Sequence, residues 1–508
     1  MENYDAIVIG SGFGGSMTAL QLIKAGMRVL MLERGDWVKR SEENWGLKAS
    51  VDLSPFYDKT TLLHIAAGGN KKTMGVYSCV GGPSVFYGGV SFRFREADFE
   101  KNEQIEGKNA EGWPIKYSDL EPYYTQAEKI LNISGETGID PTEPFRSDPF
   151  PQPPPPLAAI SQKVKAGAQQ LGLHPFQLPL AINYEDKQRQ TCVNCSNCDT
   201  FACAISAKND LSTMVLPGLM AAGMELKPNM VVIKLILDND QIAGVECVSK
   251  TTGEKYLYKS HITILAAGSL SSPHLLLASG LQYKNPGGEV IGRYLMRHIN
   301  SIIFGIFPGV ADKEGRFHKQ LAILDYYFGH PAQTHFNKLG SLQQLSTPPM
   351  GLVQNELPGP AGRFLSRGVK LLTGLLAIAE DQPQFTNSLS LDPRYKDQFG
   401  LPRPVIFHQY SERDFAALNI LINEAKKIMR KAGAIAHYVH HIRTFSHAVG
   451  TVRMGINERT SVLDGNCRFR GINNLYVTDG SVMPTSAALN PSLTIAANAL
   501  RAGELITK

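Results

Sequence analysis

The chain begins with the pattern of a strand, a glycine-rich turn, a helix and a second strand. Residues 6–9 form a short β-branched apolar run, which is typical of a buried strand. The following glycines fit G-x-G-x-x-G, the helix can end at Gly26, and a second apolar strand over residues 29–32 precedes Glu33. Because these parts occur together and in this order, the stretch predicts an α/β fold with an adenine-dinucleotide site.

Each part of this stretch has a physical role. Gly10 allows a sharp turn, Gly12 lets backbone N–H groups reach a pyrophosphate, and Gly15 lets the helix pack closely on the strand. The helix N-terminus carries partial positive charge toward the phosphates. A carboxylate at Glu33 can accept hydrogen bonds from both ribose hydroxyls, which favours a ribose without a 2′-phosphate. Taken alone, the stretch suits NAD as well as FAD.

Composition excludes several classes of protein. The 508 residues suggest two or three domains, and 43% hydrophobic with 19% charged residues indicates an ordinary globular chain. The net charge of +5 is spread without long runs, so no nucleic acid partner is expected. No apolar run reaches the length of about 20 residues that a transmembrane helix needs. The glycine motif begins too near Met1 to leave room for a signal peptide, so we expect a cytoplasmic protein.

A second glycine-rich stretch lies at Gly81-Gly82-Pro83-Ser84 and continues through an aromatic run to Gly88-Gly89. Without side chains in the way, such backbone can pass against a flat ligand. The alternative interpretation is a glycine-rich hairpin.

Further along, Ser118 and Glu121 predict the capping box of a helix, and the proline-rich segment 151–156 predicts a stiff linker. The apolar stretch 364–379 carries Arg363, Arg367 and Lys370 on its edge, and we expect a core helix there. Its alternatives are a lid on a lipophilic channel or a contact with a membrane surface.

These motifs together resemble the glucose-methanol-choline (GMC) family of FAD-dependent oxidoreductases, and in particular its bacterial cysteine-cluster dehydrogenases and its members that are similar to cholesterol oxidase. The resemblance extends over nearly the whole chain. It rests on the N-terminal glycine loop, Gly81 to Ser84, Gly268 to Gly280 around Ser272-Pro273, Ser446 to Gly455, and Tyr476 to Ser481 followed by Asn490-Pro491.

The resemblance implies an α/β protein with a Rossmann-like FAD-binding domain, assembled from discontinuous segments, and a substrate domain with an antiparallel sheet and helices. The expected boundaries are 1–150 and 225–295 for FAD binding, 151–224 for a linker with the cysteine segment, 296–440 for the substrate domain, and 441–508 for the C-terminal FAD-binding and catalytic part.

The family oxidises alcohols or sugars to carbonyls, and the resemblance implies that His447 is the active-site base and Asn490 its partner. The chemistry agrees. Hydride leaves an alcohol carbon only as the hydroxyl proton is taken or held, and a histidine titrates close to working pH. An amide can donate to the same oxygen and fix its orientation.

The resemblance also implies a set of cofactor contacts. Val231 or Val232 would touch adenine through backbone, Asp479 and Gly480 the phosphate and ribityl region, and the last helix the flavin N1–O2 edge. The predicted cofactor-binding residues are Gly10, Gly12, Phe13, Gly14, Gly15, Glu33, Arg34, Gly81, Gly82, Ser84, Tyr87, Val231, Val232, Ala267, Gly268, Asp479, Gly480, Pro491 and Thr494.

Two departures from the family pattern matter. Many relatives attach FAD through a histidine upstream of the double glycine, but residues 73–80 contain none, so we expect non-covalent FAD. Cys79 and Tyr77 leave covalent attachment open. Asn490 stands where some sugar-active relatives carry histidine, which tilts against the sugar oxidases.

A cysteine segment runs from Cys192 through Cys195 and Cys198 to Cys203, with the spacing C-x₂-C-x₂-C-x₄-C. Short spacing lets thiolates converge on one centre. The segment resembles the cysteine segment of relatives that carry an iron–sulfur cluster, and that cofactor is favoured. Zinc, or thiols that are packed or paired without metal, are the alternatives.

The predicted function is therefore an FAD-dependent alcohol oxidation with His447 as base, by a dehydrogenase that passes electrons to an external acceptor. One alternative is an oxidase that uses O₂ on a sterol-like or long-chain alcohol. Others are a non-redox lyase or isomerase on the same scaffold, and an electron-transfer subunit of a complex. The predicted partners are a small alcohol, an acceptor or O₂, and at most a membrane surface.

Overall fold

The computed structural model describes residues 3–50, 53–67, 70–107, 112–309, 319–348 and 366–508, with the single positions 350, 354, 359 and 360. The strands are β1 (Asn3–Ile9), β2 (Val29–Leu32), β3 (Tyr57–Ala67), β4 (Asn70–Tyr77), β5 (Phe176–Gln177), β6 (Glu225–Lys227), β7 (Met230–Asp238), β8 (Gln241–Ser249), β9 (Lys255–Leu265), β10 (Ile299–Ile306), β11 (Leu321–Ile323), β12 (Gly340–Leu345), β13 (Leu372–Ala379), β14 (Ser388–Lys396), β15 (Pro402–Phe407), β16 (Ala436–His441) and β17 (Leu475–Val477). The helices are α1 (Phe13–Lys24), α2 (Glu103–Glu106), α3 (Tyr117–Ile130), α4 (Ala159–Gln169), α5 (Leu211–Met214), α6 (Leu216–Ala221), α7 (Ser271–Ala278), α10 (Glu412–Lys431) and α11 (Ser492–Thr507).

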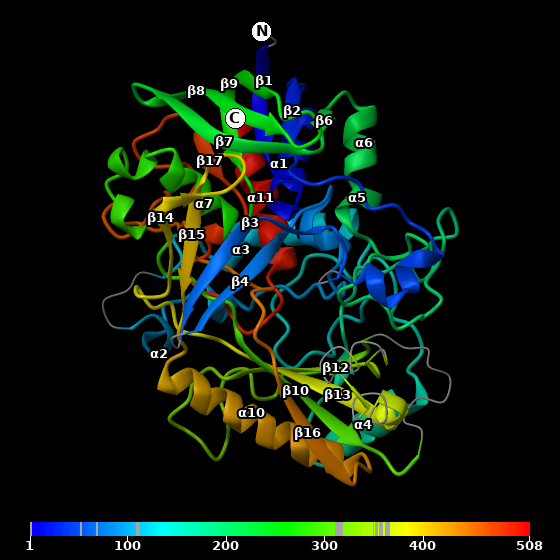
Figure 1. The fold of residues 1–508 in the computed structure, drawn as a ribbon. Helices are drawn as coiled ribbons and strands as arrows, with labels where there is room; N and C mark the ends of the chain where they lie inside the picture. The colour runs from blue at the N-terminus through cyan, green and yellow to red at the C-terminus, as the bar shows by residue number, and fades with distance from the viewer. Residues whose placement is uncertain are drawn as a thin grey trace.

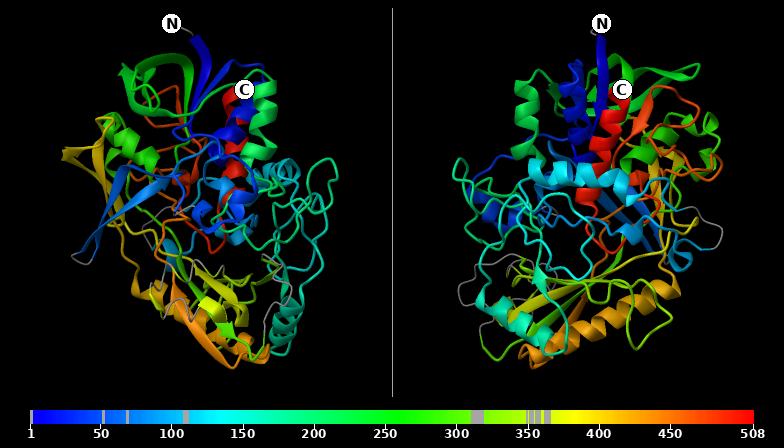
Figure 2. Two further views of the ribbon diagram at one scale, coloured as in Figure 1. Left: turned by 45° about the vertical axis from the view of Figure 1, so that its right-hand side comes forward. Right: turned by 180° about the vertical axis from the view of Figure 1, so that it is seen from behind.

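The first sheet has a parallel core in the order β6–β2–β1–β9–β17, and β8 and β7 extend it antiparallel from the first half of β9. Ile7, Val8 and Leu30 are completely buried, as strands covered on both faces require. Helices α1 and α11, from opposite ends of the chain, lie side by side against this sheet in both views of Figure 2. The two ends of the chain therefore build one unit.

The second sheet is antiparallel, in the order β16–β10–β13–β12–β11–β5. Helix α10 crosses it at the bottom of Figure 1, and α4 packs beside α10. An apolar stripe that includes Leu418, Leu421 and Ile428 is buried between helix and sheet. Ser411 caps α10, because its hydroxyl accepts the N–H of Asp414. This sheet has the position predicted for a substrate domain.

A third sheet has the order β14–β15–β3–β4, with β15 parallel to β3. It joins residues 57–77 to residues 388–407, so its pairing crosses the predicted domain boundaries. β5 and α4, which lie within the predicted linker region, likewise belong to the second sheet and its helical layer. The predicted boundaries remain predictions. The fold class, an α/β protein with a parallel dinucleotide sheet and a separate antiparallel sheet, is confirmed.

The predicted helix over residues 364–379 is wrong. Arg363 and Phe364 lie outside the described residues, and Leu372–Ala379 is strand β13 at the centre of the antiparallel sheet. A central strand buried on both faces has a continuous apolar sequence, which periodicity cannot distinguish from a buried helix. Both the lid and the membrane-surface interpretations depended on that helix.

The predicted capping box at Ser118 and Glu121 is also misplaced. The cap of α3 is Lys116, whose backbone N–H donates to the Asp119 carboxylate over 2.8 Å. Glu121 accepts instead from the buried Arg93 guanidinium over 3.0 Å. The cap thus lies two residues before the predicted Ser118, because two carboxylates, Asp119 and Glu121, stand within the same turn.

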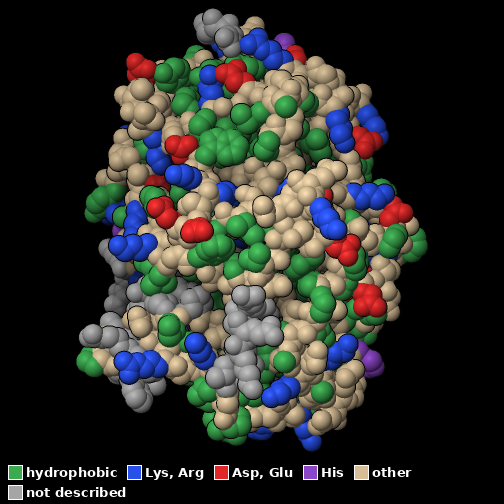
Figure 3. Space-filling model, turned by 90° about the vertical axis from the view of Figure 1, so that its right-hand side faces the viewer, with side chains coloured by type: hydrophobic (Ala, Val, Ile, Leu, Met, Phe, Trp, Pro, Cys, Tyr) green, Lys and Arg blue, Asp and Glu red, His purple; other side chains and the backbone are tan. Residues whose placement is uncertain are grey.

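The surface agrees with the balanced composition. On the face shown in Figure 3, basic side chains are interspersed with acidic ones rather than gathered in a stripe. In the part of the chain that the structure describes, no helix has both the length and the apolar character needed to cross a membrane.

Candidate active site

The predicted dinucleotide residues meet at one edge of the parallel sheet. Strands β1, β2, β9 and β17 run in the same direction, so their carboxyl ends lie together. Gly10, Glu33, Gly268 and Asp479 follow these strands within three residues. Parallel sheets bind ligands at this edge, where loops and helix N-termini converge.

In the glycine loop, the backbone of Gly15 packs directly against the backbone of Gly10. A Cβ at Gly15 would lie 1.9 Å from the carbonyl oxygen of Gly10, so a larger side chain cannot be accommodated. Gly10 has a φ of +101°, which favours glycine. A Cβ at Gly82 would lie 2.9 Å from the Gly12 Cα, and this close approach brings the two predicted glycine stretches together. At Gly12 itself a Cβ would meet nothing within 4 Å, so open space adjoins this backbone.

Glu33 is buried directly beside this loop. Its Oε2 accepts the backbone N–H of Ser11 over 3.0 Å and the Ser11 hydroxyl over 2.6 Å, and its Oε1 accepts the N–H of Gly35 over 2.8 Å. Burial raises the pKa of the carboxyl, against these hydrogen bonds. Glu33 thus braces the turn, and each oxygen keeps lone-pair capacity for further donors.

Several buried hydroxyls line the neighbouring loop. Asp479 is held by the N–H of Gly268 over 2.8 Å. Around it, Thr478, Ser481 and Ser269 are buried, and no described residue forms a hydrogen bond with their side-chain oxygens. Buried hydroxyls in native proteins normally have a partner, so these three indicate a polar ligand at this edge.

Two helix N-termini point to the same region. Neither α1 nor α11 has a side-chain cap, so their first N–H groups and the positive ends of their dipoles stay available. Pro491 is the cap residue of α11, and Thr494 in its first turn shares a hydrogen bond with Tyr124 over 2.7 Å.

The two predicted catalytic residues come together just before α11. His447 Nε2 lies 3.4 Å from the amide Nδ2 of Asn490, although 43 residues separate them in sequence. The His447 loop is fixed by pairing of Val449 with Met296 and by the N–H of Gly450, which donates to Gly480. Both side chains are half-buried. Desolvation lowers the pKa of His447 to about 3, and the neighbouring His298 and Lys319 add smaller contributions in the same direction. A neutral imidazole is the form that can accept a proton.

Sequence reasoning missed three polar residues around this pair. His298 Nδ1 lies 3.0 Å from His447 Nδ1. Gln343 donates its amide to Asn490 Oδ1 over 2.8 Å, and no described residue pairs with its own buried Oε1. Lys319 is buried and forms an ion pair with Asp199 over 3.1 Å. None of them stands in a local motif, so only folding reveals them.

The other predicted cofactor residues form contacts within the protein near the dinucleotide edge. Tyr87 packs edge-on against Phe13, with ring centroids 5.6 Å apart. Arg34 extends toward β3 and forms an ion pair with Asp58 over 3.1 Å. The strand that carries Val231 and Val232 begins beside Glu33, because the N–H of Met230 donates to the Glu33 carbonyl over 2.8 Å. Ala267 and Ser84 are held by hydrogen bonds within the two loops. Their contacts with a cofactor stay predictions.

Comparison with known proteins decides the family. Residues 4–300 and residues 383–499 match the two models described as GMC oxidoreductase. This chain belongs to the GMC oxidoreductase family. It is an FAD-dependent oxidoreductase by family, and the resemblance inferred from the motifs is confirmed.

Both oxidases and dehydrogenases occur among its relatives. It is 30% identical to paromamine 6'-oxidase of Streptomyces fradiae, over 99% of this chain and 92% of that protein. It is 28% identical to 2-methyl-1,2-propanediol dehydrogenase of Mycolicibacterium austroafricanum, over 100% of this chain and 96% of that protein. The crystal structure of pyridoxine 4-oxidase from "Mesorbium loti" has the same fold, with a TM-score of 0.71 at 18% identity and coverage of 99% and 98%.

The residues present fit the family cofactor. A glycine loop with open space at Gly12, the uncapped α1 and α11, and the unpartnered hydroxyls beside Asp479 supply the donors that a pyrophosphate and a ribityl chain require. The manner of attachment remains a prediction. Cys79 is buried, and desolvation raises the pKa of its thiol well above its ordinary value.

The cysteine segment of this family member packs against the second glycine stretch. The N–H of Thr200 donates to the Phe86 carbonyl over 2.9 Å, and the buried Lys208 ammonium donates to the Tyr87 carbonyl over 2.8 Å. The sulfur of Cys192 accepts the N–H of Asn194 over 3.3 Å. The cysteine segment thus lies next to the loop that borders the dinucleotide edge of the parallel sheet.

The thiols of this segment are free. Burial raises the pKa of Cys192 to about 12, and burial also raises the pKa of Cys198 well above its ordinary value, with the neighbouring thiols adding to both shifts. Among the described residues, however, no three Cys, His, Asp or Glu side chains form a group that could hold a metal ion. As placed, the thiols do not fit an iron–sulfur or zinc centre, and the metal stays a prediction.

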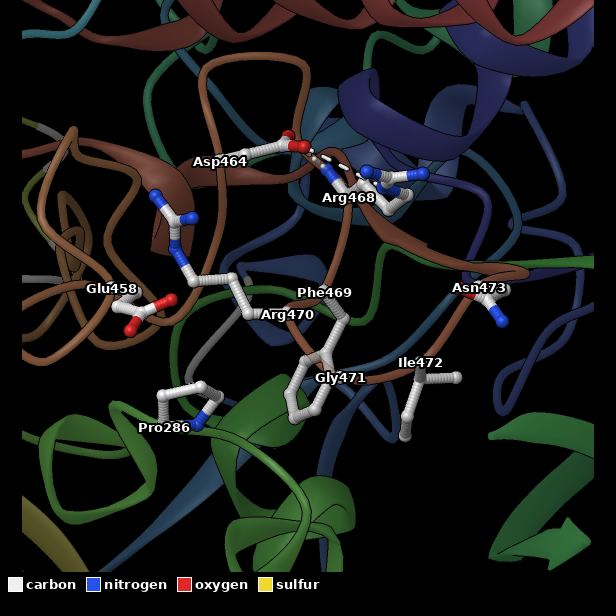
Figure 4. A pocket seen from close by; sticks show the side chains of 9 residues that line it. All are labelled: Pro286, Glu458, Asp464, Arg468, Phe469, Arg470, Gly471, Ile472 and Asn473. Carbon is white, nitrogen blue, oxygen red and sulfur yellow. Dashed lines mark hydrogen bonds and ion pairs between the residues drawn. The ribbon is translucent and has the colours of Figure 1, made fainter. Parts of the chain in front are cut away.

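A separate cavity of about 210 Å³ opens on the surface near Pro286 and Arg470 (Figure 4). The Arg470 guanidinium donates to the Gly455 carbonyl over 2.7 Å, and Asp464 pairs with Arg468 over 3.5 Å. None of the lining residues belongs to the predicted site. The cavity therefore lies apart from the predicted catalytic pair and the predicted cofactor residues.

Proposed function

We propose that this protein oxidises an alcohol to a carbonyl compound, with His447 as the base and Asn490 as the residue that orients the substrate oxygen. The observation that carries the proposal is the meeting of these two side chains beside the uncapped N-terminus of α11. FAD, when bound, supplies the acceptor for the hydride. Neutral His447 takes the hydroxyl proton at Nε2, while the Asn490 amide donates to the same oxygen and holds it in line.

The test is anaerobic reduction of the purified flavoprotein with a panel of alcohols. We expect the flavin absorbance to bleach with at least one alcohol, and His447→Ala to slow this reduction about 10²–10⁴-fold while FAD stays bound. Unchanged reduction by the variant would remove His447 from the role of base. If no alcohol bleaches the flavin while a product still forms without net electron transfer, a lyase or isomerase is the correct class.

We further propose a polar, hydroxyl-rich substrate. Lys319 and Asp199 are close enough to His447 to affect its pKa, and Gln343, beside Asn490, has a buried amide oxygen that pairs with no described residue. Such groups favour a ligand with several hydroxyls or amines over a hydrocarbon chain. The interpretation of residues 364–379 as a lid on a lipophilic channel depended on a helix, whereas residues 372–379 form strand β13. Small polyols and amino sugars should reduce the flavin faster than long-chain alcohols or sterols; the reverse order would refute this proposal.

We propose that the electrons leave to an acceptor other than O₂, as in a dehydrogenase. The support is the occurrence of dehydrogenases among the relatives, such as 2-methyl-1,2-propanediol dehydrogenase, to which the chain is similar over its full length. Reoxidation rates with O₂ and with a soluble dye separate the two classes directly. Metal analysis and the absorbance spectrum of the same sample test the iron–sulfur and zinc predictions. Faster reoxidation by O₂ than by any dye would make the protein an oxidase.

A further inference from the structure

His298 lies directly behind the predicted base. Its ring is 1% exposed and meets the His447 ring edge-on, with centroids 5.1 Å apart and an interplanar angle of 83°. The contact joins the two Nδ1 atoms over 3.0 Å. A hydrogen bond between two ring nitrogens needs one proton, so one ring donates and the other accepts.

The other nitrogen of His298 decides which ring donates. His298 Nε2 lies 3.0 Å from the backbone carbonyl oxygen of Ser486, and a carbonyl can only accept. Nε2 therefore carries a hydrogen, and in a neutral ring Nδ1 is then a bare acceptor. His447 must donate from its own Nδ1, which leaves the lone pair on its Nε2, the atom that faces Asn490. The tautomer of one ring is assigned here from the hydrogen bonds of the next.

The neutral state of His298 agrees with its surroundings. Desolvation lowers the pKa of this buried ring, and Asp381 opposes the effect without reversing it. The charged and titratable groups around the pair are Asp381 at the end of β13, with His408 3.7 Å from it, and the Lys319–Asp199 ion pair on the side of His447.

Both ends of the His298 hydrogen-bond chain are held by one carboxylate. Asp381 accepts the backbone N–H of His298 over 3.0 Å and the hydroxyl of Ser486 over 2.9 Å. The adjacent Glu380 accepts the N–H of Ala487 over 3.0 Å. The ring and the carbonyl that it contacts are thus tied to consecutive residues after β13. The backbone of His298 is left-handed, with a φ of +59°, and the hydrogen bond from its N–H to Asp381 helps to hold this conformation.

We propose that His298 is a positioning residue: by accepting the Nδ1–H of His447 and donating to the Ser486 carbonyl, it fixes the tautomer that presents Nε2 of His447 to the substrate hydroxyl. This inference rests on the proposed alcohol oxidation. When Nε2 takes the proton, the positive charge that develops on His447 strengthens its bond to the neutral His298. His298 contacts no reacting atom and acts only through His447.

The variants His298→Ala and His298→Asn test the proposal in the FAD-loaded enzyme. Alanine removes the acceptor, and we expect flavin reduction to slow about 10²-fold with little change in KM. Asparagine can accept through its amide oxygen and donate through its nitrogen, and it tolerates left-handed φ. It should restore most of the rate. His441→Ala, which removes a histidine bonded to Ser301 on the second sheet, is the matched control and should leave the rate unchanged.

A second readout does not depend on turnover. In protein labelled with ¹⁵N-histidine, the imidazole spectrum should show His447 protonated at Nδ1, with the resonance assigned by its loss in His447→Gln. In His298→Ala this tautomer should no longer be dominant. A wild-type His447 protonated at Nε2, or a His298→Ala enzyme that reduces flavin at the wild-type rate, would overturn the proposal. If no alcohol reduces the wild-type flavin, the proposed function fails, while the tautomer spectrum still decides the role of His298.

Discussion

The two ends of the active site are built in different ways. The core of the dinucleotide end is the consecutive stretch 10–33, which Gly82, Gly268 and Asp479 join from other segments, and its tightest contact is between the backbones of Gly15 and Gly10. The catalytic end brings together His298, Gln343, His447 and Asn490 from separate segments, and its contacts are between side chains. A local site tolerates almost no change in side-chain volume. An assembled site depends on the orientation and protonation of each partner. Replacing one of its side chains should therefore lower the rate of flavin reduction without loss of the fold.

The largest effect is expected at the local end. Gly15→Ala places a Cβ 1.9 Å from the Gly10 carbonyl oxygen, so helix and strand must separate. We expect loss of bound FAD and a fall of about 3 kcal/mol or more in unfolding free energy, since backbone cannot yield as a side chain can. Flavin content and urea unfolding measure both.

The matched control for this change is Gly218→Ala. Gly218 lies in α6, where a Cβ would meet nothing within 4 Å. It should stabilise the protein by about 0.5 kcal/mol and leave FAD in place. Equal flavin content in the Gly15 and Gly218 variants would contradict the contrast between the two ends.

An intermediate effect is expected where one amide orients another. Gln343→Leu removes the donor to Asn490 Oδ1 and frees that amide to turn away from His447. We expect flavin reduction to slow about tenfold, the value of one hydrogen bond, with FAD binding unchanged. The rate constant of anaerobic reduction is the measurement.

The neighbouring Gln344→Leu is the control for Gln343. Gln344 is completely buried on the opposite face of β12, and no described residue forms a hydrogen bond with its amide. Its replacement should raise stability and leave the reduction rate unaltered. An equal loss of rate in both variants would mean that β12 acts through packing alone.

The smallest effect is expected in the pH profile. Because the pKa of His447 is lowered, the base is deprotonated above that pKa, and the reduction rate should fall only as pH drops toward it. The Lys319 ammonium contributes to the lowering, so Lys319→Met should move this acid limb to higher pH. Reduction rates measured across the acid range test this.

The control for Lys319 is Lys255→Met on the exposed start of β9, which should leave the acid limb in place. An acid limb that stays fixed in Lys319→Met would show that the ion pair with Asp199 cancels the effect of the ammonium on the base.

Structure that local signals specify was predictable from this sequence, and structure that depends on tertiary contacts was not. Residues 6–33 were predictable because the turn, the helix start and the strand ends are local events with residue-specific signals. The helix predicted over residues 364–379 is wrong because residues 372–379 form a strand that is buried on both faces and therefore shows no alternation. At Asp119 and Glu121, two carboxylates competed for one cap, and only the geometry of the first turn chose between them.

By itself, the sequence determined the dinucleotide loop, the family, and His447 with Asn490 as the candidate pair, because each stands in a short motif whose spacing carries the chemistry. The tertiary structure alone decided the surroundings of that pair. It placed His298, Gln343 and Lys319 around the base and tied His298 to Asp381. Hydrogen-bond direction, tautomer and pKa depend on neighbours a few ångströms away, and those neighbours come from segments that no local pattern connects.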